Sequence, residues 1–594
     1  MPNTYVIDCE VYPNYFLLSA QNLADNSLLH FERSPYHDIG RDALKSFLSD
    51  TLTISFNGLA YDLPIIAGVI KGYNNEQIKK LSDRLVQSEE PSWLICKDIG
   101  LVVPRTWDHI DIINVAPGVA GLKLYGGRLH QQKLQDLPIS IDTVLTRSQM
   151  DEVKRYCVND LLTTRALFSA LKSEIDLRVQ ISKQYGMDVR SKGDAQIAET
   201  LISHELTHIT GREYQRPSTA QKSFRYRDPG FIAFSSPHLQ AMLQHLLETD
   251  FIIGSNGAVI MPDRLKEPVT VGGILYQMGI GGLHSMETSQ YIICGEGMTL
   301  ADYDVASYYP SIILQQRLAP AAMGEDFVEI YGSMVARRLA AKKTGDKTVA
   351  DTFKIVLNSS FGKFGSKYSK LYSPDLLIQV TMTGQLALLM LIERLTLAGI
   401  RVVSANTDGI VLYYPNDRAR DVAIIMFDWE LTTSYLLEMT PYRLIASRDV
   451  NSYLAVKPDG QVKSKGCFAK PGLSKNPDLQ IVYEAVIEAV ARGTPIEETI
   501  TGCKDTVKFV SVRRVQGGAV WRGGRLGRVV RFYYSSNVSN DEAITYATNG
   551  NRVPKSNGAR PLMDLPDEFP SDVDYPIYIT AARKLLKEIG FEER

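Results

Sequence analysis

The stretch from residue 301 to residue 313, Ala-Asp-Tyr-Asp-Val-Ala-Ser-Tyr-Tyr-Pro-Ser-Ile-Ile, constrains the fold more than any other part of the sequence. It begins as a β-strand and stops at Pro310, with Asp304 near the end of the strand and two tyrosines just before the proline. A carboxylate on a rigid strand beside aromatic side chains can hold a metal ion next to a flat substrate. A capped strand end, in which Asp304 satisfies a turn, is the simpler interpretation of so short a motif.

Length and composition indicate a soluble protein of several domains. The chain has 594 residues, of which 44% are hydrophobic and 22% charged, as in ordinary globular proteins. The apolar run Leu386–Ile392 is too short to cross a bilayer, and the N-terminus shows no secretory signal. The six cysteines form no Cys-x-x-Cys pair. We therefore expect a cytoplasmic protein with free thiols and no membrane contact.

The charge of the chain is unevenly distributed. Net charge is only −2, yet residues 508–560 carry ten Lys or Arg against Asp541 and Glu542. Arginine forks match phosphate oxygens, glycines allow a backbone to approach, and aromatic rings stack on sugars or bases. The segment therefore predicts contact with nucleic-acid phosphates, with a solvated basic hairpin as the alternative. The arginines expected to touch DNA are Arg522, Arg525, Arg528 and Arg531.

Acidic residues are paired near the N-terminus. Thr4–Glu10 alternates as a strand, so Asp8 and Glu10 leave the same face. Two like charges this close repel each other unless a cation lies between them, and Mg²⁺ or Mn²⁺ prefers such oxygen ligands. The polar face of an edge strand is the alternative. Residues 53–62 then form a strand and a turn that contains Asn57 and Asp62.

A helix follows later in the chain. Residues 148–151, Ser-Gln-Met-Asp, resemble a capping box, and Val153–Leu171 has helical periodicity. Tyr156 and Asp160 are four residues apart and share one face of this helix. An aspartate on the inner face of a helix needs a partner.

These three patterns, Asp-x-Glu, Asn-x-x-x-Tyr-Asp and Tyr-x-x-x-Asp, resemble the motifs of DnaQ-like 3′→5′ exonucleases. The resemblance implies a ribonuclease-H-like sheet and two divalent ions held by Asp8, Glu10, Asp62 and Asp160. It also implies that Tyr156 orients the attacking water and that Asn57 and Tyr61 touch a single-stranded 3′ end. A lysine often assists such sites; Lys133 is our choice, although an ordinary surface lysine is an equal alternative.

Two helices are expected after the opening stretch, Asp326–Lys343 and Lys347–Phe361, separated by a turn. Lys354, Asn358 and Phe361 lie on one face of the second helix, and Lys342 can approach Lys354 across the hairpin. Two cations facing one gap suit a triphosphate, whereas two solvated lysines are the alternative.

Two strands, Ile400–Ala405 and Ile410–Tyr414, are joined by Asn406-Thr-Asp-Gly409. Asp-Gly is a tight-hairpin signal, which puts Asp408 at the apex of a rigid turn. Asp304 and Asp408 would then form a second two-carboxylate metal site, or Asp408 serves the turn alone.

Together these segments resemble the polymerase half of family B DNA polymerases, especially small phage-encoded ones. The resemblance implies that Asp304, Asp408 and Val305 hold two Mg²⁺ ions, for which Mn²⁺ can substitute. It implies that Tyr309 packs under the sugar and excludes a 2′-hydroxyl. The residues implied for binding the incoming dNTP are Lys354, Lys342, Tyr309, Asn358, Phe361 and Ser307, and Tyr453 and Lys465 are implied for DNA.

The sequence departs from this family at several positions. Asn406 stands where the family has an aspartate, and Phe361 replaces a tyrosine. The usual Lys-x-Tyr motif is Asn451-Ser-Tyr453, so Lys463 or Lys465 is expected to contact a primer phosphate instead. Asp302, on the same strand face as Asp304, is not expected to join the metal site.

The resulting prediction is an α/β multidomain protein that combines a ribonuclease-H-like exonuclease with a right-hand polymerase of antiparallel palm, two-helix fingers and thumb. The expected boundaries are 1–175 for the exonuclease, 176–300 for a connecting region, 301–325 and 366–470 for the palm, 326–365 for the fingers and 471–594 for a basic thumb and C-terminal region.

The spacing of the motifs refines the functional prediction. Only 49 residues separate Asp304 from Lys354, and only 53 separate Lys354 from Asp408. Protein-primed relatives carry long insertions at both places. We therefore expect synthesis from an RNA or DNA primer, poor strand displacement, and cooperation with a helicase or primase and a single-strand binding protein.

The predicted function is template-directed DNA synthesis with 3′→5′ proofreading by a monomer, in the replication of a phage genome in the bacterial cytoplasm. An exonuclease whose polymerase half only clamps DNA is the first alternative. A DNA-binding scaffold without enzymatic activity is the second.

Overall fold

The computed structural model describes residues 3–218 and 221–591. The chain forms two compact units, each assembled from three segments. Unit 1 comprises Met1–Gly193, Lys470–Ile481 and Thr501–Tyr578, and unit 2 comprises Asp194–Ala469, Val482–Ile500 and Ile579–Arg594. The expected thumb, 471–594, is therefore not one body: its basic segment belongs to the same unit as the N-terminal domain.

Unit 1 contains a mixed five-stranded sheet with the strand order β3-β2-β1-β4-β5. Strands β1, β2 and β3 pair antiparallel, whereas β1, β4 and β5 pair parallel. The strands are β1 (Thr4–Tyr12), β2 (Tyr15–Asn22), β3 (Leu28–Arg33), β4 (Leu52–Ser55) and β5 (Asp108–Asp111). The predicted N-terminal strand is confirmed, and it extends to Tyr12 because Val11 and Tyr12 are also buried.

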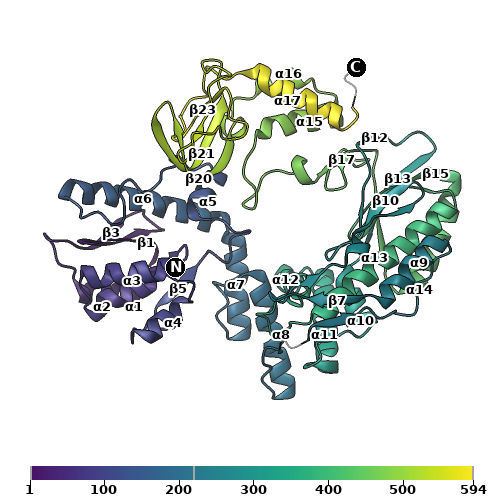
Figure 1. Ribbon diagram of the computed structural model, residues 1–594, viewed down its shortest axis with the longest axis horizontal. Helices are drawn as coiled ribbons and strands as arrows, with labels where there is room; N and C mark the ends of the chain where they lie inside the picture. The colour runs from purple at the N-terminus through teal and green to yellow at the C-terminus, as the bar shows by residue number, and fades with distance from the viewer. Residues whose placement is uncertain (1–2, 219–220, 592–594) are drawn as a thin grey trace. The chain divides into compact units, whose positions relative to one another are not determined.

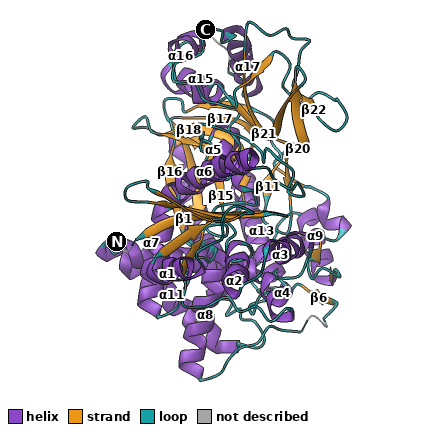
Figure 2. Cartoon of the chain, turned by 90° about the vertical axis from the view of Figure 1, so that its left-hand side faces the viewer, coloured by secondary structure: helices purple, strands orange, loops and turns teal. Residues whose placement is uncertain are grey.

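Helices cover both faces of this sheet. Figures 1 and 2 show α6 on one side of β1 and the group α1 to α3 on the other. The helices are α1 (Arg41–Asp50), α2 (Asp62–Lys71), α3 (Asn75–Gln87), α4 (Ser92–Asp98), α5 (Leu122–Arg128), α6 (Arg147–Ala170) and α7 (Lys172–Tyr185). The capping box of α6 is formed by Thr146 and Gln149 instead of the predicted Ser148 and Asp151, so the helix begins earlier.

The basic segment forms a long hairpin of β20 (Ser511–Trp521) and β21 (Gly524–Tyr534), flanked by β22 (Thr545–Tyr546) and β23 (Ala559–Pro561). Val512 and Val529 of the hairpin pack against Leu124 and Leu134. Gly127 permits this close approach, because a Cβ there would lie 2.7 Å from Val512. The hairpin is therefore built onto α5 of the N-terminal domain.

Arg531 was predicted to bind DNA, and the structure contradicts this prediction. Its side chain is fully buried, and it donates hydrogen bonds to the backbone carbonyls of Gln131, Gln132, Leu562 and Met563. Burial lowers the pKa of this guanidinium to about 10. Arg531 therefore joins β21 to the loop after α5 and cannot reach a ligand.

Unit 2 is centred on a seven-stranded sheet with the order β16-β13-β15-β14-β11-β10-β9, in which each neighbouring pair is antiparallel. The strands are β9 (Val269–Val271), β10 (Ile274–Gln277), β11 (His284–Ser285), β13 (Met298–Val305), β14 (Arg401–Asn406), β15 (Gly409–Pro415) and β16 (Leu437–Pro441). The central strands β13 and β15 carry mostly buried residues, as expected for the middle of a sheet.

The opening stretch of the sequence is a strand followed directly by a helix. Strand β13 ends at Val305, and α10 (Tyr308–Gln315) begins after Ser307, whose φ is 48°. Pro310 was predicted to stop the strand, but it lies inside the first turn of α10. The missing N–H of a proline costs nothing there, because the first amides of a helix have no partner within it.

Smaller elements complete unit 2. A four-stranded sheet has the order β12-β17-β18-β19, and a three-stranded sheet the order β6-β7-β8. Their strands are β6 (Ser223–Arg225), β7 (Asp250–Ile253), β8 (Val259–Ile260), β12 (Gln290–Ile293), β17 (Leu444–Asp449), β18 (Ser452–Val456) and β19 (Val462–Ser464). The helices are α8 (Asp194–Thr210), α9 (Pro237–Glu248), α11 (Gly324–Thr344), α12 (Lys347–Lys363), α13 (Pro374–Leu397), α14 (Ala419–Thr433), α15 (Gln480–Arg492) and α16 (Ile496–Gly502). Helix α17 (Tyr575–Glu588) begins in unit 1 and ends in unit 2.

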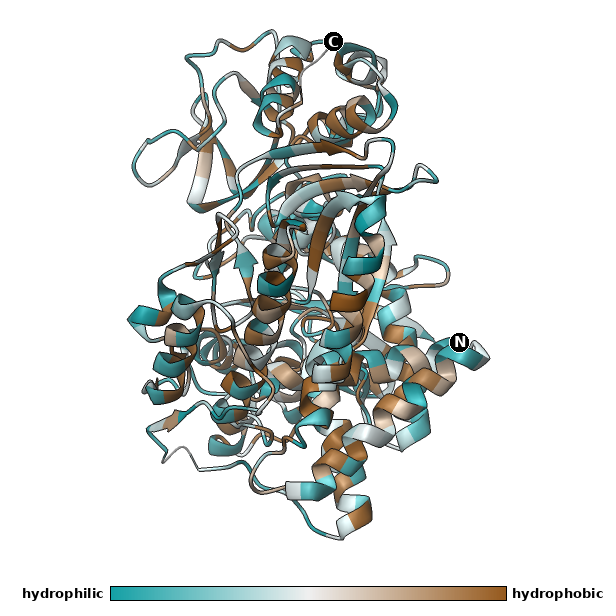
Figure 3. Cartoon of the chain, turned by 90° about the vertical axis from the view of Figure 1, so that its right-hand side faces the viewer, coloured by the Kyte–Doolittle hydropathy of each residue, from teal (hydrophilic) through white to brown (hydrophobic). Residues whose placement is uncertain are grey.

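Helix α13 is the core helix of unit 2. It is long and apolar enough to cross a bilayer by length and composition, but 89% of its most apolar window is buried inside the protein. Most other helices are amphipathic, as the alternating brown and teal bands in Figure 3 show.

We predict that Arg531→Met lowers the free energy of unfolding of unit 1 by roughly 2–4 kcal/mol, because four buried carbonyls lose a charged donor. Urea denaturation followed by tryptophan fluorescence measures this, since Trp93, Trp107 and Trp521 lie in unit 1. Arg525→Met, at an exposed position of the same strand, should change the value by less than about 0.5 kcal/mol. Equal effects of the two substitutions would contradict the structural role of Arg531.

Candidate functional site

Unit 1 brings four carboxylates together. Asp8 and Glu10 leave the same face of β1, Asp62 is the first residue of α2, and Asp160 lies on α6. Possible ligand atoms of Asp8, Glu10 and Cys157 all lie within 4.8 Å of one another. Two of the four predicted carboxylates thus come from alternate positions of one strand, and the other two come from two different helices.

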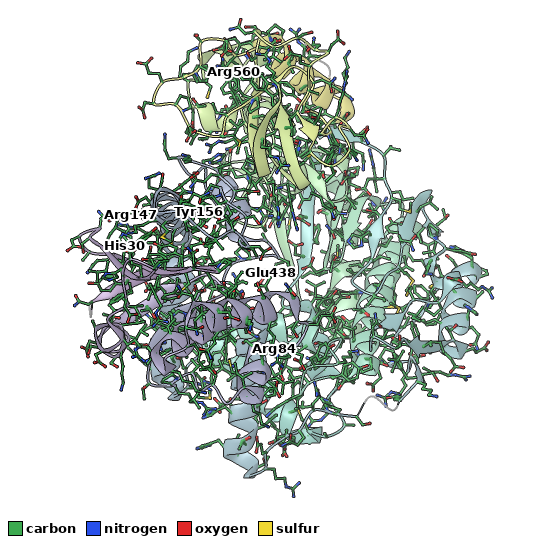
Figure 4. The ribbon with its side chains drawn as sticks, turned by 60° about the vertical axis from the view of Figure 1, so that its left-hand side comes forward. His30, Arg84, Arg147, Tyr156, Glu438 and Arg560 are labelled. Atoms are coloured by element: carbon green, nitrogen blue, oxygen red, sulfur yellow. The ribbon has the colours of Figure 1, made fainter. Side chains whose placement is uncertain are left out.

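A lysine completes this cluster. Lys123 of α5 forms an ion pair with Asp160, and its Nζ lies 4.2 Å from the centre of the Tyr156 ring. Figure 4 labels Tyr156, which lies on α6 one turn before Asp160. Lys133 was the predicted lysine; its backbone pairs with Asp564 in an isolated β-bridge, and its side chain is exposed. Lys133 lines the same small cavity as Lys123, so the role predicted for Lys133 stays a prediction, and Lys123 is a second candidate that the sequence analysis missed.

Burial and mutual repulsion disfavour the charged forms of these carboxylates. Burial, followed by the negative charge of Asp160, raises the pKa of Glu10 to about 8. Burial also raises the pKa of Asp62 to about 7. The pKa of Asp8 is raised by burial and then by Glu10, and the pKa of Asp160 is raised by burial despite Lys123. The group therefore binds protons unless another cation replaces them.

The donor set fits a hard divalent cation. Apart from the Cys157 thiol, its possible ligand atoms are carboxylate oxygens, which Mg²⁺ and Mn²⁺ prefer. Oδ1 of the buried Asp62 has no hydrogen-bond partner among the described residues, although unpaired buried oxygens are costly. This oxygen of Asp62 is available to a metal without breaking another hydrogen bond.

The two residues predicted to touch a single-stranded end have different environments. Asn57 is half-buried with φ of 74°, and its backbone N–H donates to the buried Asp111. The Tyr61 ring packs against the core of unit 1, and its hydroxyl hydrogen-bonds to Ser82. Tyr61 therefore has a structural role in this state, which the sequence did not indicate.

Cys157 is a member of the cluster that the sequence analysis missed. Its thiol donates to Oδ2 of Asp8 at 3.4 Å and is fully buried. It lies three residues before Asp160 on α6, the spacing of neighbours on a helix face, so the periodicity of the helix could have identified it.

Unit 2 places Asp304 and Asp408 at the ends of adjacent strands. Asp304 of β13 lies opposite Gly409 of β15, and the Val305 N–H donates to the Asp408 carbonyl at 2.7 Å. The predicted hairpin is confirmed, but its turn residues are Thr407 and Asp408 instead of Asp-Gly. Gly409 belongs to the strand, where a Cβ would lie 2.3 Å from Oδ1 of Asp304. Only glycine leaves room for the Asp304 carboxylate.

Asp302 and Lys463 form an ion pair next to Asp304. The buried Asp302 accepts hydrogen bonds from the Tyr442 hydroxyl and from Lys463 Nζ, both at 2.9 Å. Lys463 Nζ also lies 3.9 Å from Oδ2 of Asp304. Lys463 was one of two lysines expected at a primer phosphate; its ion pairs with two aspartates favour a role inside the protein instead.

Burial and neighbouring charges also raise the pKa values of the two aspartates in the second site. Burial and then the charge of Asp302 raise the pKa of Asp304 to about 6, although Lys463 acts to lower it. Partial desolvation raises the pKa of Asp408. Glu438 of β16, labelled in Figure 4, lies opposite Asp304 in the sheet and adds a third negative charge.

An aromatic wall and a helix face adjoin Asp304. The ring centroids of Tyr309 and Phe361 are 4.4 Å apart, and the Tyr309 hydroxyl donates a hydrogen bond to the Gly281 carbonyl. Lys354 and Asn358 are exposed on the same face of α12 as Phe361, as predicted. Two further residues of the predicted set, Lys342 and Ser307, are also exposed.

The remaining predicted DNA contacts are divided between free and occupied side chains. Tyr453 is half-buried against the core, and the Lys465 N–H donates to its carbonyl, leaving the Lys465 side chain exposed. Arg522 forms an ion pair with Glu542 and lies over the Trp521 ring. Arg525 and Arg528 are exposed.

Comparison with known proteins points to DNA polymerases. No protein-family model matches the chain. The chain is 27% identical to DNA polymerase 1 of Aeropyrum pernix over 205 residues, which are 28% of this chain and 21% of that protein. It is 25% identical to DNA polymerase 1 of Sulfurisphaera ohwakuensis over 123 residues, which are 20% of this chain and 14% of that protein. The chain thus spans about a fifth or less of the length of these relatives.

Among solved structures, the chain is similar to the family B DNA polymerase from the hyperthermophilic archaeon Pyrobaculum calidifontis. The TM-score is 0.42 and the identity 14%, over 99% of this chain and 78% of that one. Part of the sequence is therefore similar to archaeal DNA polymerases.

The raised pKa values predict how stability depends on pH. Glu10 changes from an ordinary pKa of 4.5 to about 8 on folding, and Asp62 from 3.8 to about 7, so the folded protein binds more protons than the unfolded chain between these values. The metal-free protein should therefore lose stability as pH rises from about 5 to 8. Thermal unfolding in EDTA measures this.

Two controls accompany this measurement. The double variant Glu10→Gln, Asp62→Asn should flatten the profile, because it removes the groups that release protons. Mg²⁺ should raise the unfolding temperature more at pH 8 than at pH 6. A profile that is flat in the parent protein would contradict the pKa shifts.

Proposed function

We propose that the protein is a DNA-directed DNA polymerase with a 3′→5′ proofreading exonuclease. The observation that carries this proposal is the pair Asp304 and Asp408, fixed by the β13–β15 register beside the Tyr309–Phe361 wall. The partial similarity to archaeal DNA polymerases supports the same activity. The separate carboxylate cluster of unit 1 and the strand order β3-β2-β1-β4-β5 support the exonuclease.

In the proposed polymerase site, Asp304 and Asp408 hold two Mg²⁺ ions, with Mn²⁺ as a substitute. When bound, the ions lower the pKa of the primer 3′-hydroxyl and neutralise charge on the triphosphate. Asp302 keeps Lys463 beside Asp304, which limits repulsion between the carboxylates. Lys354 presents its ammonium on the exposed face of α12, where it binds phosphate oxygens.

In this proposal Tyr309 selects deoxyribonucleotides over ribonucleotides. The ring is held from two sides, by Phe361 and by the hydrogen bond to Gly281. Because these two contacts fix the Tyr309 ring, a ribonucleotide with a 2′-hydroxyl would clash with it. Steric exclusion of this kind requires a side chain that cannot move aside. Phe361 and Asn358 line the base pair on the same helix face.

In the proposed exonuclease site, Asp8, Glu10, Asp62 and Asp160 hold the divalent ions. Tyr156 orients the attacking water with its hydroxyl, and Lys123 stabilises the negative charge that develops on the phosphate. Asn57 binds the single-stranded end from the turn before α2.

The broader setting remains part of the proposal. The short intervals on both sides of Lys354 favour extension of an RNA or DNA primer. We propose that the enzyme acts as a monomer in phage genome replication, with a helicase or primase and a single-strand binding protein as partners. Poor synthesis through duplex DNA without a helicase is expected.

Single-residue variants separate the two activities. Asp304→Asn should reduce primer extension by at least about 10³-fold and leave degradation of single-stranded DNA intact, because it disables one site only. Asp8→Ala should do the reverse. Both reactions are followed on labelled primers with Mg²⁺, and deoxy and ribo triphosphates are compared.

The two activities of the parent protein test the alternative functions. A parent protein that degrades DNA but never extends a primer would establish the exonuclease with a DNA clamp. A parent protein without either activity would establish a binding scaffold.

Gly409→Ala provides a second, subtler test. A Cβ at this position lies 2.3 Å from Oδ1 of Asp304, so the carboxylate must move. Primer extension should fall by about tenfold or more, because misplacement of a catalytic group by about 1 Å is costly. Gly472→Ala, where a Cβ meets nothing within 4 Å, is the matched control. Exonuclease activity should not change in either variant.

A further inference from the structure

The basic hairpin β20–β21 is anchored beside the carboxylate site of unit 1. Its strand β21 contacts Asp136 twice: the Arg528 N–H donates to Oδ2 at 2.9 Å, and a Cβ at Gly527 would lie 3.0 Å from Cγ. The φ of Gly527 is 103°, a conformation that glycine adopts readily. The hairpin therefore meets the loop after α5 through a backbone contact that only glycine permits.

The loop after α5 lines a cavity next to the carboxylate cluster of unit 1. One cavity is lined by Lys123, Lys133, Asp136 and Asn159 together with Val529 of β21. Lys123 is the lysine that pairs with Asp160. Strand β21 thus forms part of the wall next to the exonuclease residues.

Three arginines of the hairpin are left for a ligand. Arg513 pairs with Asp478, Arg522 pairs with Glu542, and Arg531 is buried. In contrast, Arg514, Arg525 and Arg528 are exposed, and the described part of the chain offers them no acidic side chain within ion-pair distance. Arg514 lies opposite Val529 in the register, so both side chains leave the same face of the hairpin.

We propose that Arg514, Arg525 and Arg528 bind the phosphates of the single-stranded DNA end that enters the exonuclease site. The hairpin then guides a frayed 3′ end toward the carboxylates instead of holding the duplex in the polymerase site. This inference rests on the proposed exonuclease function. Its ligand is a single strand, because the proposed exonuclease site beside the hairpin takes a single-stranded end, and exposed arginines bind backbone phosphates without base readout.

The test uses the full chain with Arg514→Gln, Arg525→Gln and Arg528→Gln combined. Binding of a labelled oligothymidylate is measured by fluorescence anisotropy in the Asp8→Ala background, so that the strand is not cut. Affinity should fall by about tenfold or more, and the slope of log affinity against log salt should fall by about two, at about 0.7 per phosphate contact. In the otherwise unmutated protein, degradation of single-stranded DNA should fall in parallel, and extension of a matched primer should change by less than about twofold.

Arg522→Gln is the matched control, because its guanidinium is already held by Glu542. The three Arg→Lys substitutions keep the charge and should restore most of the binding, which distinguishes phosphate contact from misfolding. An unchanged salt slope would overturn the inference, as would a loss of primer extension with normal degradation. If the parent protein binds through these arginines but degrades nothing, the exonuclease function fails and the binding surface stands.

Discussion

Repulsion between carboxylates that are held close together in water-poor surroundings is the interaction on which both sites depend. Burial and like charge raise the pKa of Glu10 to about 8 and that of Asp304 to about 6. A cluster of this kind is stable only when protons, lysines or metal ions neutralise it. Each unit supplies one lysine, Lys123 or Lys463, which is fewer positive charges than the carboxylates around it. The remaining negative charge favours a bound cation, which is the basis for the divalent ions that we propose at both sites.

Rigid elements hold these repelling groups in place. Asp8 and Glu10 share a strand face because side chains alternate along β1, and Asp304 meets Asp408 because β13 and β15 are in register. The repulsion is thus resisted by backbone hydrogen bonds along two sheets instead of by flexible loops. Gly409 illustrates the precision required, since one methyl group there would displace Asp304.

Local periodicity related some of these residues in the sequence, and the resemblance to known families grouped the carboxylates into two expected sites. Strand alternation identified Asp8 with Glu10, and helical spacing identified Tyr156 with Asp160. Their counterions could not be found in this way. Lys123 is 37 residues from Asp160, and Lys463 is 161 residues from Asp302, so only the tertiary fold pairs them. Local rules also misjudged Pro310, which is compatible with the first turn of a helix as well as with the end of a strand.

The basic segment shows why counting charges is insufficient. Arg531 resembles the neighbouring arginines in the sequence, yet its side chain donates a hydrogen bond to the backbone carbonyl of Gln131, which is 400 residues away. It is a structural residue that fixes the hairpin to the N-terminal domain. Once this arginine and the paired Arg513 and Arg522 are set aside, the positive charge that remains lies along strands attached to the carboxylate site. The same attachment that buries Arg531 therefore brings the Arg528 backbone to Asp136 and leaves the Arg528 side chain exposed.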